Sequence, residues 1–185
     1  KSKKYVKILQ VWESFLHDPG QDADTASNAE LTVIDSSCQR IYKKYQSVVK
    51  TGHLILENTE DERLHVLRIH CKKLRYLMEF FSSLFPPRKI NVLIEQLKKL
   101  QDNLGDFNDL CIQQEYLLNI TEELIATGRQ INKTLVAIGS LIGTLDRKKQ
   151  IVKDAFARTF TDFASPANKR LFRELFSSQV RETIS

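Results

Sequence analysis

Twelve consecutive residues in the middle of the chain, HVLRIHCKKLRY (65–76), carry ionisable side chains at a spacing suited to anion binding. On a helix of about 100° per residue, one arc collects polar and charged side chains: His65, Arg68, Lys72, Arg75, Tyr76 and Glu79. The opposite arc is apolar, with Leu64, Leu67, Cys71, Leu74, Met78 and Phe81. The segment therefore predicts a helix with one core face and one cationic face. We call His65, Arg68, Lys72, Arg75 and Tyr76 the central arc.

The central arc concentrates positive charge at a cost. Lys72 has a like-charged neighbour on each side, Arg68 and Arg75, and each such pair destabilises a helix by about 0.2–0.5 kcal/mol. Glu79 can relieve Arg75, whereas the helix offers no acid to Arg68 or Lys72, and an ordinary exposed face more often alternates its charges. A plain exposed face, or salt bridges to another helix, remains an alternative for this helix alone. His70 falls at the margin of the core, and Lys73 lies off the arc.

A second set of cations precedes this helix. One face of the predicted helix 29–50, the upstream arc, carries Arg40, Lys43, Lys44 and Ser47. Its other face is apolar: Leu31, Ile34, Cys38, Ile41, Tyr45 and Val49. If the two helices pack antiparallel, the arcs flank one groove, whose potential favours a linear polyanion over a small anion.

In such a groove arginines would hold phosphate oxygens in bidentate pairs, and lysines would act as point charges. Protonation of His65 would add a positive charge, so we expect binding to tighten toward acidic pH.

The helices that carry these residues belong to an entirely helical pattern. The 3.6-residue period and its stop signals predict helices at 3–17, 29–50, 59–85, 88–103, 106–127, 130–163 and from 165 onward. Gly52, Gly105 and Gly128 are interpreted as stops, and Asp106 as an N-cap. Thr59 with Glu62 has capping-box spacing, and Ser165-Pro166 is typical of a helix start. Short connections between long amphipathic helices predict an all-α, antiparallel helical bundle.

The amino-acid composition limits the number of domains and the class of protein. The 185 residues are 42% hydrophobic, enough for one domain with a core, which we divide into a connecting helix and loop (1–28), a four-helix bundle (29–128) and C-terminal helices (129–185). A net charge of +5 raises the expectation of an anionic partner.

Three scattered cysteines, Cys38, Cys71 and Cys111, predict reduced thiols and a cytoplasmic location. We find no membrane span or signal peptide, and a chain that opens on Lys1 suggests a fragment.

The residues of the central arc also resemble a known family. The run HVLRIHCKKLRYLMEF resembles the signature helix of the CHAD domain, the conserved histidine α-helical domain, at His65, Arg68, Lys72, Leu74-Arg75-Tyr76 and Glu79. The segment LKKLQDNLGDFNDL (97–110) is similar to the second block of the family. The resemblance is firm over 59–118 and looser over the rest. The family has a histidine–arginine helix in each of two halves, and only one is found here, because His17 lacks the basic spacing. The chain therefore resembles the C-terminal half.

The resemblance implies a fold of two four-helix-bundle halves with a basic surface that binds inorganic polyphosphate. It implies a module that is not itself an enzyme, needs no cofactor and is often fused to, or encoded near, a triphosphate-tunnel enzyme. The central arc matches the residues that face the polyanion, and Arg40 and Lys44 match the basic preceding helix less closely. Three residues match positions that organise hydrogen bonds near a helix junction: Gln101, Asn108 and Asp109.

Other chemistry is less favoured. Asp102, Asp106 and Asp109 could be a magnesium cluster, but the N-cap interpretation of Asp106 explains them better. His65 and His70 point to different faces, which excludes an HExxH-type zinc pair. The sequence has no Walker loop, GxGxxG or GxSxG motif, and Arg147-Lys148-Lys149 is interpreted as a solvated cluster. Nucleic-acid binding is the alternative to polyphosphate binding, followed by docking of an acidic protein partner and, last, phosphohydrolase activity.

Overall fold

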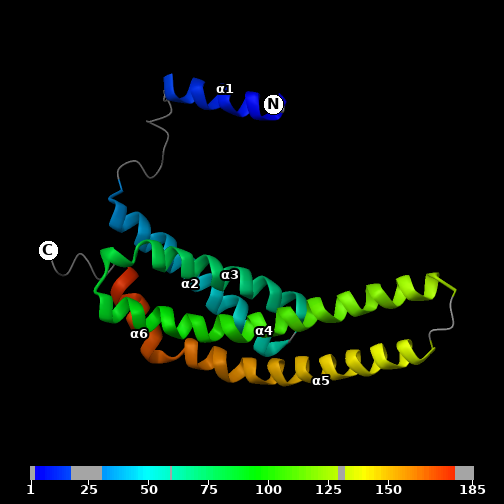
Figure 1. Cartoon of the computed structure of the whole chain (residues 1–185). Coiled ribbons are helices and arrows are strands. Elements are labelled where there is room, and N and C mark those ends of the chain that lie inside the picture. The colour runs from blue at the N-terminus through cyan, green and yellow to red at the C-terminus, as the bar shows by residue number, and fades with distance from the viewer. Residues whose placement is uncertain (1–2, 18–30, 59, 129–131, 178–185) are drawn as a thin grey trace. The chain divides into compact units, whose positions relative to one another are not determined.

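A computed structural model describes residues 3–17, 31–58, 60–128 and 132–177 of the chain (Figure 1). Its elements, in order, are α1 (Lys3–His17), α2 (Val33–Glu57), α3 (Asp61–Phe80), the short 3₁₀ helix η2 (Ser82–Leu84), α4 (Pro87–Ala126), α5 (Asn132–Phe163) and α6 (Pro166–Phe176). The described residues form no strand. The predicted all-α, antiparallel bundle is confirmed. None of the described helices combines the length and the apolarity of a membrane span.

The chain divides into two units, residues 1–36 and residues 37–185. The first unit contains α1, whose bounds agree with the prediction. The apolar side chains described on α1 are exposed: Tyr5, Val6, Ile8, Leu9, Val11 and Trp12. The predicted loop DPGQDADTAS (18–27) lies outside the described residues.

Local polar contacts explain several helix ends. The Thr32 hydroxyl accepts the Asp35 backbone N–H at 3.2 Å and donates to the Asp35 carboxylate, which is a capping arrangement at the start of α2. At α6 the Ser165 side chain accepts the Asn168 N–H, and Pro166 occupies the first turn, as predicted. Gly128 follows α4 with φ +64°, the conformation expected at a helix end. Thr59 lies outside the described residues, and Glu60 occupies the N-cap position of α3.

Three predicted helix ends are wrong. Instead of ending at Lys50, α2 passes through Gly52 to Glu57, and α4 passes without a break through Gly105 and Asp106. Asp106 is therefore an interior residue and not an N-cap. A glycine inside a helix costs only about 1 kcal/mol relative to alanine, so packing of a helix can outweigh it. In addition, α3 ends at Phe80, before the predicted Phe85, and the short η2 follows.

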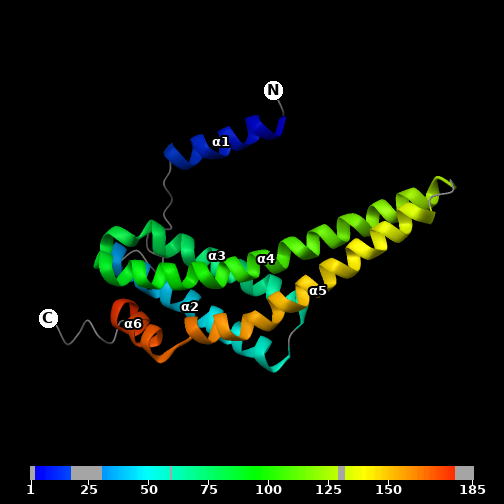
Figure 2. The ribbon, with the colours of Figure 1, turned by 60° about the horizontal axis from the view of Figure 1, so that its bottom comes forward.

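The core of the second unit has two parts. Antiparallel α3 and α4 bury leucines against one another, and α4 pairs along its length with α5 (Figure 2). Both figures show the distal ends of α4 and α5 extending past α2 and α3 as a two-helix hairpin. The other part of the core is a phenylalanine cluster from α5 and α6: Phe156, Phe160, Phe163, Phe172 and Phe176. Helices α5 and α6 therefore supply much of the core.

The phenylalanine cluster holds α2. The Tyr45 ring stacks on Phe172 with centroids 3.8 Å apart, and burial raises the pKa of Tyr45 to about 12. The backbone of α2 comes closest at Gly52, where a Cβ would lie 2.0 Å from the Phe160 ring. A side chain does not fit at this point, and this explains why the helix has a glycine here.

We expect Gly52→Ala to lower the free energy of unfolding by about 1–3 kcal/mol, because the added methyl group overpacks the Phe160 contact. Gly105→Ala is the matched control, because no atom lies within 4 Å of its Cβ position. That variant should gain about 0.5–1 kcal/mol from helix propensity. Denaturant unfolding measures both. A Gly52→Ala variant as stable as the control would contradict the packing described, and Phe160→Leu should relieve part of the loss.

Candidate anion-binding site

The central arc lies on α3 beside α4. His65 Nδ1 is 3.3 Å from Asn108 Oδ1, and Asn108 Nδ2 donates to Asp109 Oδ1 at 3.4 Å. Because α3 and α4 run antiparallel, the register set by His65 and Asn108 brings Lys72 level with Gln101. Gln101 Oε1 is buried and has no hydrogen bond among the described residues. Asn108 and Asp109 thus share polar contacts at the α3–α4 edge, and both lie inside one continuous helix and not at a junction.

Tyr76 organises the other end of the arc. Its ring is half exposed and lies 5.8 Å from Lys72 Nζ and 5.9 Å from Arg75 Cζ, so both cations are within the range of a cation–π contact. Arg75 Nε is 3.4 Å from Glu79 Oε1 but has no hydrogen bond of good geometry within the described part of the chain. Glu79 therefore compensates the charge of Arg75 only weakly.

Some cations elsewhere in the bundle have carboxylate partners. Lys89 pairs with Glu174, and Asp61 receives both Lys149 (3.6 Å) and Lys153 (2.8 Å). Lys149 also contacts Asp146 and Gln114, so the predicted solvated cluster 147–149 is partly wrong. Within the described residues, by contrast, no carboxylate lies within 4.0 Å of six cations on α2 and α3: Arg40, Lys43, Lys44, Arg68, Lys72 and Lys73. Their mutual repulsion has no ion pair to offset it there.

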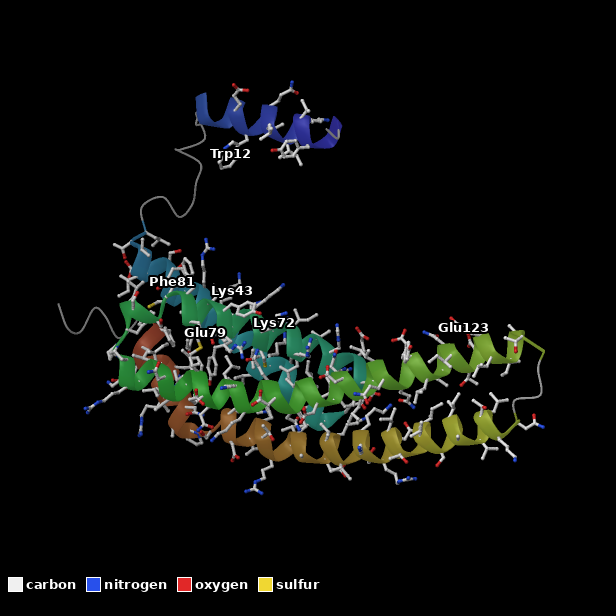
Figure 3. All side chains as sticks on the ribbon, in the orientation of Figure 1. Trp12, Lys43, Lys72, Glu79, Phe81 and Glu123 are labelled. Carbon is white, nitrogen blue, oxygen red and sulfur yellow. The ribbon has the colours of Figure 1, made fainter. Side chains whose placement is uncertain are left out.

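The two arcs do not line a single groove as expected. His65 faces α4, whereas α2 packs beside the other edge of α3, where Thr51 Oγ1 lies 3.5 Å from His70 Nδ1. In Figure 3, Lys43 and Lys72 both project from the side of α2 and α3 that lies away from α5. Lys43 and Lys72 thus lie on the same side of the bundle, on two different helices.

The contact between α2 and α3 contains residues that were left off the predicted arc. His70 is influenced there by Lys44 of α2 and by Lys73 of its own helix. Burial and these two cations lower the pKa of His70, while a hydrogen bond to the Ser47 backbone opposes the shift. We call Lys44, Thr51, His70 and Lys73 the seam cluster. The i, i+3, i+7 spacing of Lys44, Ser47 and Thr51 was the available sequence signal, since it places all three on one helix face.

A pocket of about 210 Å³ closes the His65 end of the central arc. Polar and apolar side chains both line it: Asp61, Glu62, His65, Leu104, Phe107, Asn108 and Cys111. The Cys111 pKa is raised mainly by burial, with Lys149 acting in the opposite direction. Asp61 and Glu62 place negative charge in this pocket, at the His65 end of the central arc.

Metal and thiol chemistry find little support in the described residues. Histidines, cysteines and acids there form no group of three able to hold a metal ion, so Asp102, Asp106 and Asp109 do not converge. All three cysteines are free thiols, with Cys38 and Cys71 buried. Burial raises the pKa of the Cys71 thiol strongly, so it is held as a neutral thiol.

The sequence pattern of the CHAD domain matches residues 1–118, more than half of the 185 residues. The chain belongs to the CHAD domain family. The match includes α2, α3 and the part of α4 that faces them, and thus every residue of the central arc and the seam cluster.

Two curated relatives of this CHAD protein are uncharacterized proteins from two strains of Mycobacterium tuberculosis. Each is 23% identical over 118 residues, which is 64% of this chain and 21% of the relative. The chain therefore spans about a fifth of the length of the curated relatives it matches.

The placement of Lys44 near His70 can be tested through the pKa of His70. Its folded-state pKa lies below 6.5, so the folded protein resists protonation, and stability present above pH 6.5 falls as the pH drops toward the lower value. We expect Lys44→Met to raise the His70 pKa in an NMR titration, because one repelling charge is gone. Lys169→Met on α6 is the control and should leave it unchanged. Equal His70 titrations in both variants would contradict the placement of Lys44.

Proposed function

We propose that this CHAD domain binds inorganic polyphosphate, without catalysis, through the cations of α2 and α3. The observation that carries the proposal is the gathering of six cations on α2 and α3. Among the described residues no carboxylate lies within 4.0 Å of any of the six. A folded protein tolerates such repulsion more readily when an anionic ligand offsets it. The family resemblance supports polyphosphate as that ligand.

The distribution of the cations favours a linear ligand. The central arc covers more than three turns of α3 from His65 to Tyr76, and the upstream arc adds about two turns of α2. A single phosphate would reach only one or two of these side chains, whereas a chain of phosphates would neutralise several at once. Arg68 would offer bidentate hydrogen bonds, and Lys43 and Lys72 would act as mobile point charges.

We further propose that the domain acts together with a triphosphate-tunnel enzyme, either fused to it or encoded nearby. The enzyme would then supply catalysis, and the CHAD domain would hold the polyanion. Co-purification from cells with intact and with polyphosphatase-treated extracts would test the association. Capture that survives the treatment would indicate direct protein docking and would count against a polyphosphate link.

Single-stranded nucleic acid is the second candidate ligand, because the surface carries more aromatic area than the sequence suggested. Phe80 is 79% exposed and follows Tyr76 by one turn, so two rings are available for base stacking beside the cations. Direct competition at fixed salt between polyphosphate, single-stranded RNA and duplex DNA separates the candidates. We expect polyphosphate to displace both nucleic acids, and equal affinities would reduce the function to general polyanion binding.

Salt dependence tests the surface itself. We expect Arg68→Gln/Lys72→Gln to weaken polyphosphate binding and to reduce the slope of log Kd against log salt by about one for each cation lost. The matched control is Lys169→Gln/Arg170→Gln, which removes two exposed charges from α6. Calorimetric titration at several salt concentrations measures both slopes. If the two double variants bind alike, α3 is not the binding surface.

A further inference from the structure

We propose that the seam cluster, formed by Lys44, Thr51, His70 and Lys73, is a second phosphate subsite that binds the anion together with a proton. This inference rests on the proposed polyphosphate function and adds residues and a pH response to it. His70 lies outside the central arc, and on the sequence alone Lys73 belonged to neither arc. Their shared position appears only when α2 and α3 are packed together.

Groups from two helices, α2 and α3, act on the His70 imidazole. From α2 come the Lys44 ammonium, the Ser47 backbone and the Thr51 hydroxyl, which is 3.5 Å from His70 Nδ1. From α3 itself comes Lys73. Lys44 and Lys73 are the charged groups that act on His70, and within the described residues no carboxylate lies within 4.0 Å of these three side chains. The cluster therefore has donors and positive charge but no anion of its own.

This composition suits a phosphate oxyanion. Burial and the repulsion from Lys44 and Lys73 lower the His70 pKa. A phosphate between the two lysines would offset that repulsion, and its oxygens would accept a hydrogen bond from the imidazolium. The ring would then take one proton from solvent as the phosphate arrives. The Thr51 hydroxyl can donate to the same anion, because a hydroxyl serves as donor or acceptor.

The seam cluster is continuous with the central arc. Lys73 and Lys72 are adjacent in α3, so the seam cluster and the central arc lie next to each other on this helix. A helix with its side chains is about 10 Å wide, a span that a chain of phosphates can cross and a single phosphate cannot. We therefore infer that polyphosphate crosses α3 from the seam to Lys72 and Arg68.

The experiment follows His70 by NMR with and without saturating long-chain polyphosphate, whose few end groups contribute little titration of their own. The His70 pKa should rise on binding, and binding should tighten from pH 8 to pH 6. A rise of one pKa unit allows up to about a tenfold tightening. In His70→Gln the ratio of Kd at pH 8 to Kd at pH 6 should fall toward one. Thermal unfolding at pH 8 checks that this variant is folded.

Lys73→Gln provides a second variant at an exposed position. It should weaken binding and reduce the salt slope by about one, whereas Lys169→Gln on α6 should change neither. A His70 pKa that stays unchanged under bound polyphosphate, or an unaltered Kd ratio in His70→Gln, would overturn the subsite and leave polyphosphate binding intact. Absence of polyphosphate binding at every pH would overturn both proposals.

Discussion

The contact between the α2 backbone at Gly52 and the Phe160 ring of α5 is the constraint on which the candidate site depends. A Cβ at this position would lie 2.0 Å from the ring, so α2 approaches the phenylalanine cluster more closely than any other residue would allow. Tyr45, stacked on Phe172, fixes the same helix two turns earlier. With one face held by aromatic rings, α2 must turn Lys44, Ser47 and Thr51 toward α3. The seam cluster is thus a consequence of core packing on the far side of the helix.

Sequence periodicity predicted the helical class and most of the core, but it failed at two of three glycines. Gly52, Gly105 and Gly128 each follow a long amphipathic stretch, and each costs a helix about the same propensity. Only Gly128 adopts a positive φ and ends its helix. Gly52 is required by a ring far along the chain, and Gly105 lies in a helix that α3 and α5 support from two sides. The local signal is identical in all three cases, because the deciding contacts are tertiary.

The same limit applies to the site. A helical wheel separated the core face of α3 from its charged face correctly, with Leu64, Leu67 and Leu74 fully buried. It could not say which neighbour covers which edge. His65 turned out to face Asn108 of α4, and His70 faces Thr51 of α2. Residues that look marginal on one helix become part of a site when a second helix supplies the missing groups.

The unpaired cations link stability to function. Each like-charged neighbour on α3 disfavours the folded helix slightly, and the buried phenylalanine and leucine core must outweigh that repulsion in the free protein. A polyanion that binds only the folded state would remove the repulsion and would stabilise the bundle by mass action. The aromatic cluster of α5 and α6 therefore has two roles: it positions α2 against α3, and it supplies part of the stability that offsets the repulsion between their cations.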